Sequence, residues 1–301
     1  MTRLDAIPDA GECAAHAAAL THFSPSAVAQ ALKCGVQFGF SRIRGLKLPP
    51  GVALLVGGAA AQSAEANRRD YMSHGTWLDP STARDWAVAS LDRRWIEEPP
   101  DLKPGESRGD ATDDVAAHAE IHARDLAPLV IPERVEQAVT LRVDGVPVPV
   151  EGYVDVIGRS VQSDRVVVRD DKTTGSSTRW TGLADLGDSP QLGIYAAAVA
   201  GAEGLAVEDV SVGVLVSRVV HSRAKVPKPP NVSTAVLATE HVAPLVARAE
   251  QQTRAAWRMI QSGALAPAPE GAWWCAPKWC GYHAEAGGPC PLGRPGKNGE
   301  E

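Results

Sequence analysis

A change of pattern at about residue 133 limits the fold more than any other feature of this sequence. Before it, apolar residues recur at helical spacing. After it they alternate, first in ERVEQAVTLRV and then, past an Asp-Gly pair, in VPVPVEGYVDVIG. Alternation on both sides of such a pair predicts two strands joined by a tight turn. Further strands are predicted in SDRVVVRDD and DVSVGVLVSRVV, with a helix in DSPQLGIYAAAVAG between them. We therefore expect an α/β fold with a mixed, mainly antiparallel sheet and a crossover helix.

The 301 residues divide into four segments by composition. Residues 1–22 are alanine-rich without a strong period and are expected to be a loose leader. Residues 23–130 are predicted to be helical, and the first helix has Ser24 as N-cap with proline following it. Residues 131–262 hold the predicted sheet and end in a long amphipathic helix. Residues 263–301 are too irregular for a packed helix or sheet and carry three of the five cysteines.

Charge and hydropathy restrict the function classes. The apolar runs, such as GVALLVGGAAA, are too short and glycine-rich to span a membrane, so no membrane partner is expected. The N-terminus has an early acid and no continuous apolar core, so no signal peptide is expected and the predicted location is the cytoplasm. The net charge of −6 argues against non-specific coating of nucleic acid, but a local basic channel could still hold DNA.

The stretch VVVRDDKTT is an apolar strand that ends in opposite charges. Side chains alternate along a strand, so Asp170 and Lys172 would share one face and Asp171 would point the other way, as a hydrogen-bonding or surface group. In a hairpin, Asp155 of the preceding strand could approach Asp170. Two carboxylates and a lysine suit a hard divalent cation such as Mg²⁺. The alternative is a solvated strand end with weak surface ion pairs.

Several blocks in order resemble the RecB-like branch of the PD-(D/E)XK nuclease superfamily. GYVDVI is similar to the strand that carries its first metal-binding aspartate, here Asp155, and RDDKTT to its D-x-K-T element, here Asp170 and Lys172. SPQLGIY resembles its Q-x-x-x-Y helix, here Gln191 and Tyr195. FSPSAVAQALKCGVQFGFSRIRGLKLPPG is similar to its N-terminal block, which has a cysteine on the first helix.

This resemblance implies a restriction-endonuclease-like fold, with a mixed central sheet flanked by helices. It implies a Mg²⁺- or Mn²⁺-dependent deoxyribonuclease, with exonuclease favoured over endonuclease. Asp155 and Asp170 would hold the metal, Lys172 would position the attacking water, and Gln191 with Tyr195 would lie beside the site. For this last pair the alternative is simple packing of a helix on the sheet.

One position departs from the family pattern. Its second helix often carries glycine, then histidine four residues later, then glutamate, and the histidine contributes to the metal site. This chain has GAAAQSAEAN, with Gln62 at the histidine position and Glu65 close behind. A glutamine oxygen could ligate the metal but cannot act as an imidazole base. Gln62 and Glu65 are therefore expected to complete the metal shell, unless Gln62 is an ordinary exposed helix residue.

The late cysteines have the spacing C-x4-C-x9-C, and alone they could bind zinc or be free thiols. The family includes an iron–sulfur subgroup with one cysteine before the nuclease core and three after it, among them helicase-associated nucleases and CRISPR-associated RecB-like exonucleases. WWCAPKWCGY also resembles the tails of RecB-type proteins carried by phages and prophages. The resemblance implies a 4Fe–4S cluster, with zinc as the alternative, on Cys34, Cys275, Cys280 and Cys290.

Two functions of different classes follow. The first is an exonuclease that hydrolyses phosphodiester bonds at DNA ends. The second is a catalytically weak nuclease fold that binds DNA ends or assembles with a helicase, a recombinase, an annealing protein or a phage complex, which the glutamine at position 62 favours. A restriction-type endonuclease is a third interpretation, although no separate recognition domain is visible in the sequence.

Overall fold

The computed structural model describes residues 7–161, 163, 165–175, 186–219 and 229–292. The chain forms two compact units, each built from separate stretches. Unit 1 comprises Met1–Leu48, Thr140–Glu151 and Arg248–Glu301, and unit 2 comprises Pro49–Val139 and Gly152–Ala247. The units therefore do not follow the segments expected from composition. The helices after residue 49 share a unit with the sheet, and the N-terminal residues share one with the cysteine-bearing tail.

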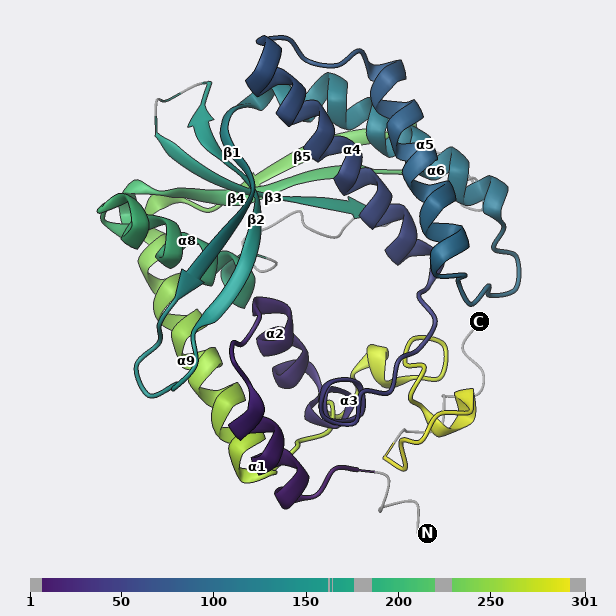
Figure 1. The fold of residues 1–301 in the computed structure, drawn as a ribbon, viewed down its shortest axis with the longest axis vertical. Helices are drawn as coiled ribbons and strands as arrows, with labels where there is room; N and C mark the ends of the chain where they lie inside the picture. Colours follow the sequence, from purple (N-terminus) through teal and green to yellow (C-terminus); the bar gives the residue numbers. More distant parts are fainter. Residues whose placement is uncertain (1–6, 162, 164, 176–185, 220–228, 293–301) are drawn as a thin grey trace. The chain divides into compact units, whose positions relative to one another are not determined.

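One five-stranded sheet has its strands in chain order (Figure 1). Strands β2 and β3 pair antiparallel, β3 and β4 pair parallel, and β4 and β5 pair antiparallel. The predicted mixed sheet is thus confirmed. The sequence did not predict β5, because its residues are all exposed or partly exposed and show no buried apolar face. The strands are β1 (Val130–Leu141), β2 (Val150–Ser160), β3 (Val166–Thr174), β4 (Ser211–Arg218) and β5 (Asn231–Val236).

Helix α8 (Pro190–Glu203) connects β3 to β4 and accounts for their parallel pairing, since parallel neighbours need a crossover. Its N-cap is Ser189, whose side chain accepts a hydrogen bond from the Leu192 N–H. The short 3₁₀ turns η5 (Val207–Asp209) and η6 (Thr239–His241) flank the last two strands.

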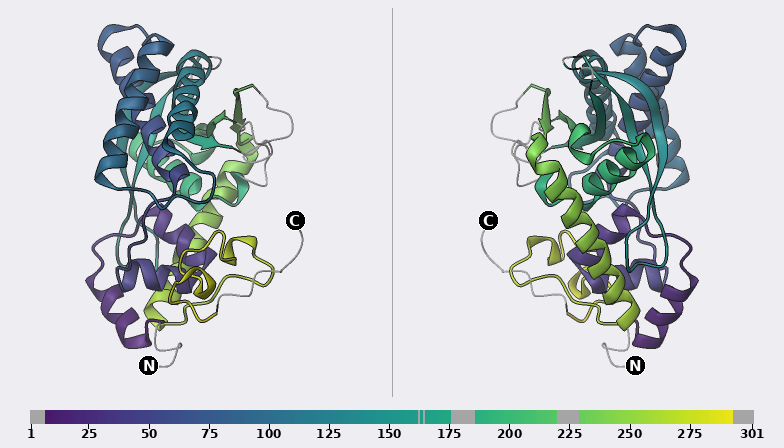
Figure 2. Two further views of the ribbon diagram at one scale, coloured as in Figure 1. Left: turned by 90° about the vertical axis from the view of Figure 1, so that its right-hand side faces the viewer. Right: turned by 90° about the vertical axis from the view of Figure 1, so that its left-hand side faces the viewer.

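Three further helices of unit 2 pack on one another around a small apolar core, and Figure 2 shows them in blue. Their contacts are made largely by alanine, leucine and valine, which allows close approach. The last helix continues into a π-helical turn and a 3₁₀ turn before β1. These elements are α4 (Val52–His74), α5 (Pro80–Glu97), α6 (Arg108–Ile121), η3 (His122–Leu126) and η4 (Ala127–Leu129).

Unit 1 begins with a helix where a loose leader was expected. Residues Ala10–Ala19 form α1, because Asp9 and Glu12 make a reciprocal capping box. The next helix, α2 (Pro25–Lys33), starts at Ser24 as predicted, and the Ser24 hydroxyl accepts from the Ala27 N–H. This helix breaks at Cys34, and the chain resumes as α3 (Gly35–Phe38) and the π-helical turn η2 (Gly39–Ile43).

The described part of the tail packs on these N-terminal helices within unit 1. Tyr282 stacks on Phe40 with ring centroids 5.6 Å apart, and its hydroxyl donates to the Leu46 carbonyl at 2.7 Å. The Gly35 N–H donates to the Ala266 carbonyl at 2.7 Å, an approach that a side chain at position 35 would obstruct. Unit 1 also holds most of α9 (Val242–Ser262) and the turns η7 (Trp273–Cys275) and η8 (Ala284–Ala286).

The helices in the described part of the chain include none that combines the length and the apolar character needed to cross a bilayer.

Candidate active site

Two acids and a lysine meet where β2 and β3 separate. The pairing of these strands ends with Val156 opposite Arg169, one residue before Asp155 and Asp170. The Asp155 Oδ2 atom accepts a hydrogen bond from the Asp171 backbone N–H at 2.6 Å. The Lys172 ammonium forms an ion pair with Asp170. The predicted alternation is confirmed: Asp170 and Lys172 lie on one face of β3, and the hairpin brings Asp155 to them.

Helix α8 supplies two polar groups to the same face. The Gln191 amide nitrogen donates to Asp170 Oδ1 at 3.1 Å and lies 3.1 Å from the Tyr195 hydroxyl oxygen, one helical turn later. The Lys172 ammonium lies 3.5 Å from Gln191 Oε1. Tyr195 is also 4% exposed, so its ring packs in the core, as the packing interpretation predicts, while its hydroxyl joins the polar network. A role of the pair beside a metal ion stays a prediction.

Burial makes negative charge unfavourable at both acids. Burial, then the charges of Asp170 and Asp171, raise the pKa of Asp155 well above its ordinary value. The pKa of Asp170 is also raised, first by burial, although Lys172 opposes this. Burial alone would lower the pKa of Lys172, but Asp170 and Asp155 outweigh it and raise that pKa. Two carboxylates thus share one ammonium, so a further cation would be stabilised here.

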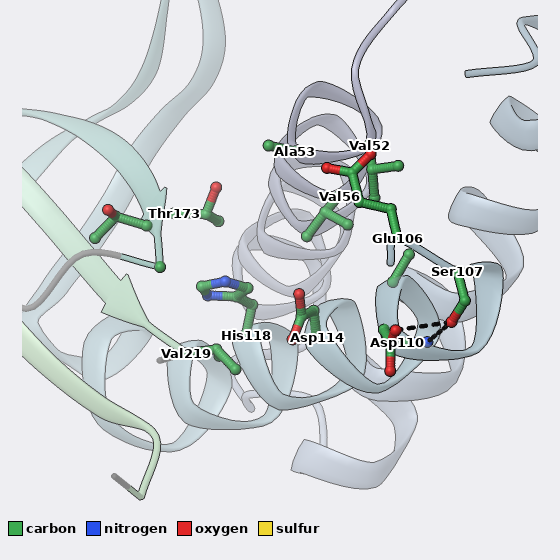
Figure 3. Close-up of a pocket in the computed structure, with 13 residues that line it drawn as sticks. Val52, Ala53, Val56, Glu106, Ser107, Asp110, Asp114, His118, Thr173 and Val219 are labelled. Carbon is green, nitrogen blue, oxygen red and sulfur yellow. Dashed lines mark hydrogen bonds between the residues drawn. The ribbon is translucent and has the colours of Figure 1, made fainter. Parts of the chain in front are cut away.

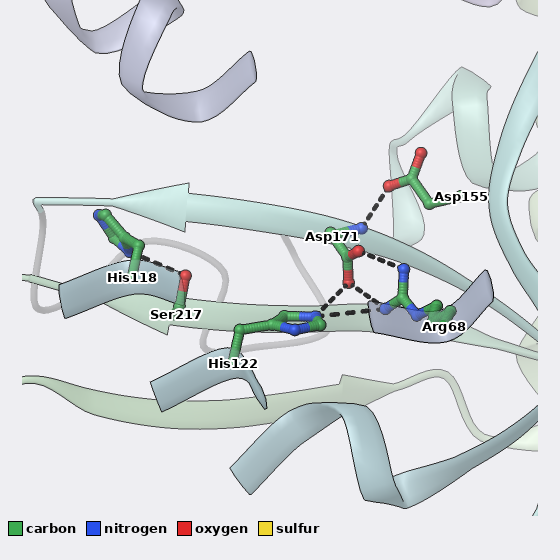
Figure 4. A network of polar contacts seen from close by, with 6 residues as sticks. All are labelled: Arg68, His118, His122, Asp155, Asp171 and Ser217. Carbon is green, nitrogen blue, oxygen red and sulfur yellow. Dashed lines mark hydrogen bonds and ion pairs between the residues drawn. The ribbon is translucent and has the colours of Figure 1, made fainter. Parts of the chain in front are cut away.

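The opposite face of β3 holds a second network (Figure 4). Asp171 receives two hydrogen bonds from Arg68 of α4, at 2.6 and 2.8 Å, and lies 3.2 Å from His122 Nε2. Burial would raise the pKa of Asp171, but Arg68 and then His122 hold it well below its ordinary value. The expected orientation of Asp171 is confirmed, and of its two predicted roles the hydrogen-bonding one holds, because its carboxylate is nearly buried and bonded to Arg68.

Two hollows adjoin this second face and share Ala53, His118 and Thr173. One, of about 310 Å³, lies between the small residues of α4 and the ends of β3 and β4. The other, of about 340 Å³, has the carboxylates of Glu106, Asp110 and Asp114 on its wall (Figure 3). The 310 Å³ hollow is lined by Ala53, Leu54, Gly57, Gly58, Ala60, Ala61, Ala64, His118, His122, Asp171, Lys172, Thr173 and Ser217.

Comparison with known proteins now decides the family. The model of the PD-(D/E)XK nuclease superfamily matches residues 22–284, most of the chain. The chain belongs to the PD-(D/E)XK nuclease superfamily. A similar solved structure is that of a protein from Eubacterium rectale named "Putative exonuclease", which matches with a TM-score of 0.53 and 13% identity. The match covers 93% of this chain and 91% of that one, and at this identity it shows the fold. None of the curated proteins compared with the chain matches it in sequence.

Within this superfamily fold, Gln62 is not brought to the acids. Its side-chain oxygen accepts a hydrogen bond from the Ser90 hydroxyl of α5, and it borders a different hollow, with Arg93, Arg94, Glu97 and Glu98. Each helical residue advances the direction of the side chain by about 100°. Ala61 and Ala64 line the hollow beside β3, and Gln62 therefore points well away from it.

On α4, Glu65 lies between the direction in which Gln62 points and the direction of the hollow beside β3. It pairs with Arg69 one turn later at 2.8 Å, and none of the hydrogen bonds or ion pairs identified among the described residues joins it to Asp155 or Asp170. Burial, then the charges of Glu65 and Asp171, raise the pKa of Glu136 on β1. Glu136 has a φ of 49°, which is uncommon for a residue other than glycine.

The partners of Asp171 are not predictable from the sequence motifs. Arg68 and His122 lie 103 and 49 positions before it, and no spacing rule links such residues. Arg68 falls on the same face of α4 as Gly57, Ala61 and Ala64, but only the folded chain shows that this face packs against β3. A Cβ at Gly57 would lie 3.2 Å from Thr173 Oγ1, so that face packs tightly against the end of β3.

The four cysteines predicted for a cluster all belong to unit 1. Cys34, Cys280 and Cys290 share an apolar cluster with Val36 and Phe40. Burial, then the neighbouring Cys275, Cys290 and Cys34, raise the pKa of the Cys280 thiol. The thiols therefore gather in one region. However, the described residues include no group of three or more His, Cys, Asp and Glu side chains arranged to hold a metal ion.

Proposed function

We propose that this chain is a Mg²⁺- or Mn²⁺-dependent deoxyribonuclease that acts on DNA ends. The observation that carries the proposal is the meeting of Asp155 and Asp170, two acids whose pKa values are raised by burial, with an ammonium next to Gln191. The name of the Eubacterium rectale protein adds support for an exonuclease over an endonuclease.

The residues fit a hard divalent cation. Magnesium is commonly held by one or two carboxylates, with waters and substrate phosphate completing its shell. Asp155 and Asp170 would hold it, and the ion would supply an activated water and offset charge on the phosphate. One or two carboxylates suffice for such a site.

The roles of the other residues follow from their contacts. Lys172, charged because of Asp170 and Asp155, would donate hydrogen bonds to the attacking water or the phosphate rather than remove a proton. Gln191 would orient both Lys172 and the Asp170 carboxylate, with its own side chain held by Tyr195. In-line hydrolysis of a phosphodiester bond is the reaction that this arrangement serves.

The test uses labelled linear DNA and closed circular DNA, each incubated with purified protein and Mg²⁺, Mn²⁺ or EDTA. We expect shortening of linear DNA with metal, no reaction in EDTA and intact circles. Asp85→Asn is the matched control for a substitution of Asp170, because the side chain of this α5 residue is 72% exposed and pairs only with the partly exposed Arg84 among the ion pairs of the described residues. Cutting of circles would replace exonuclease by endonuclease, and no cleavage of any DNA would overturn the proposal.

A second candidate is a catalytically weak subunit that binds DNA ends and assembles with a recombination or repair partner. The engagement of Gln62 with Ser90 favours it, because the position expected to complete the metal shell then contributes nothing. Binding of linear ends without cleavage in the same assay would support this function instead.

We also propose that Cys34, Cys275, Cys280 and Cys290 bind a 4Fe–4S cluster that fastens the tail to the N-terminal helices. The donor chemistry fits, since four thiolates are the usual ligands of such a cluster. The thiols as placed do not form a closed ligand set, so binding would require them to draw together. Anaerobically purified protein should contain iron and absorb broadly in the visible range. Colourless protein with zinc would support the alternative metal, and metal-free protein would overturn both.

A further inference from the structure

The Arg68–Asp171–His122 network is unusual because all three groups are withdrawn from solvent. The Arg68 side chain is 2% exposed, and those of Asp171 and His122 are each 9% exposed. Arg68 reaches both carboxylate oxygens of Asp171, with Nη1 on Oδ2 at 2.6 Å and Nη2 on Oδ1 at 2.8 Å. The His122 Nε2 atom lies 3.2 Å from Asp171 Oδ1 and 3.2 Å from Arg68 Nη2.

A gain in folding stability does not by itself account for a buried ion-pair network of this kind. Two charges lose their hydration on burial, and an apolar pair of similar volume is often as stabilising or more so. The strand that carries Asp171 begins with three buried valines, Val166–Val168, so apolar packing on this strand is available to the fold. A buried ion pair that contributes little to stability is a candidate for a positional role.

The backbone of Asp171 provides the link to the candidate active site. While its carboxylate is fixed to α4 and η3, its N–H donates to Asp155 Oδ2 at 2.6 Å. Figure 4 shows the other Asp155 oxygen directed away from this bond. The middle residue of the D-x-K element therefore connects α4 and η3 to the Asp155 carboxylate.

We propose that Arg68, Asp171 and His122 are positioning residues for Asp155. They anchor β3 at Asp171, so that its N–H holds one Asp155 oxygen and leaves the carboxylate oriented for a divalent cation shared with Asp170. This inference rests on the proposed metal-dependent function. Groups that orient a metal ligand typically contribute about 10–100-fold to metal affinity or activity.

The test compares a paired replacement with single ones. Arg68→Met or Asp171→Leu alone leaves a buried charge without its partner and can unfold the protein. The double variant Arg68→Met/Asp171→Leu removes both charges and is expected to remain folded. Ser63→Ala is the matched control: this buried α4 hydroxyl donates to the Ala83 carbonyl at 2.6 Å, towards α5, so it loses one buried hydrogen bond outside the network.

Three quantities are measured for the full-length protein: the urea midpoint, Mn²⁺ affinity by calorimetry without DNA, and cleavage of linear DNA. We expect the double variant to keep a near-normal urea midpoint while Mn²⁺ affinity and kcat each fall by about 10–100-fold. Ser63→Ala should keep wild-type affinity and kcat. His122→Gln, which retains a donor, should retain more affinity than His122→Leu.

The outcomes separate the inference from the proposed function. A folded double variant with wild-type Mn²⁺ affinity and kcat would overturn the positioning role and leave the nuclease proposal standing. Wild-type protein that neither binds Mn²⁺ nor cleaves DNA would overturn the nuclease proposal, and the inference with it. If the double variant unfolds, the His122→Gln and His122→Leu pair decides: equal Mn²⁺ affinity in both, at the wild-type value, contradicts the positioning role.

Discussion

The two faces of strand β3 carry adjacent aspartates with opposite electrostatics. On the α8 face, burial raises the pKa of Asp170, and Lys172 only partly offsets this effect. On the α4 face, Arg68 and His122 overcome burial and lower the pKa of Asp171. The positive charge near Asp170 does not fully offset the cost of burying its carboxylate, whereas the charge near Asp171 does. This difference is the basis of the two roles that we propose, a metal ligand for Asp170 and a structural anchor for Asp171.

The largest effect is expected on the α8 face of β3, where nearby positive charge does not fully offset the buried carboxylates. Asp170→Asn should reduce cleavage of linear DNA by about 1,000-fold or more, because a metal ion contributes several kcal/mol and each 1.36 kcal/mol is tenfold in rate. The fold should survive, because Asp155 remains as a counter-charge for Lys172, whose side chain is 24% exposed. Initial rates and urea unfolding in EDTA measure both effects. Full activity of the variant would remove Asp170 from the metal site.

The second effect concerns the α4 face of β3, where Asp171 is paired with Arg68, and it is measured as a loss of folding stability. Asp171→Asn leaves the buried Arg68 without its anionic partner, and breaking such a pair costs about 3–5 kcal/mol. The free energy of unfolding from urea titration at neutral pH measures this loss. An unchanged free energy of unfolding would show that the ion pair is not maintained in the folded protein.

The pH dependence of that loss has a definite sign. The pKa of Asp171 is lowered on folding, so its contribution to stability is present above the unfolded value of about 3.9 and is lost as the pH falls further. The difference in free energy of unfolding between the wild type and Asp171→Asn should therefore shrink below about pH 4. A difference that widens in acid would contradict the assignment.

A smaller effect on catalysis should follow from removing the contacts that α8 makes with Asp170 and Lys172. Gln191→Ala removes the group that contacts both Asp170 and Lys172, so kcat should fall by about 10–100-fold, with little change in the affinity for DNA. Tyr195→Phe keeps the buried ring and removes only the hydroxyl next to Gln191, so its effect should be less. Steady-state kinetics on linear DNA distinguish the two variants, and equal loss in both would mean that the hydroxyl itself is needed.

The smallest effect is expected at Gln62. Gln62→Ala removes one hydrogen bond to Ser90, worth about 1 kcal/mol, and should leave cleavage and Mn²⁺ affinity unchanged. Calorimetry and the cleavage assay measure both quantities. A large loss of Mn²⁺ affinity would show that Gln62 turns towards the metal after all.

The alternation in VVVRDDKTT and its neighbouring strand is sufficient to predict that Asp155, Asp170 and Lys172 lie together. The SPQLGIY block likewise predicts that Gln191 and Tyr195 share one helix face. The side of α4 that faces the sheet cannot be obtained in this way. Its sequence from Gly57 to Ala64 is almost entirely small residues, so no apolar stripe marks the buried direction, and Gln62 lies one helical step from the face that lines the hollow beside β3.

Which residues share a face of β3 follows from the sequence alone, because the period of a strand is two and does not depend on neighbours. The superfamily follows in the same way, through blocks that occur in order. The rotation of α4, and hence the pairing of Arg68 with Asp171 across 103 positions, emerges only in the folded chain. Helix rotation is set by packing against two neighbours at once, here α5 on one side and the end of β3 on the other. That balance of contacts cannot be read from the helix alone.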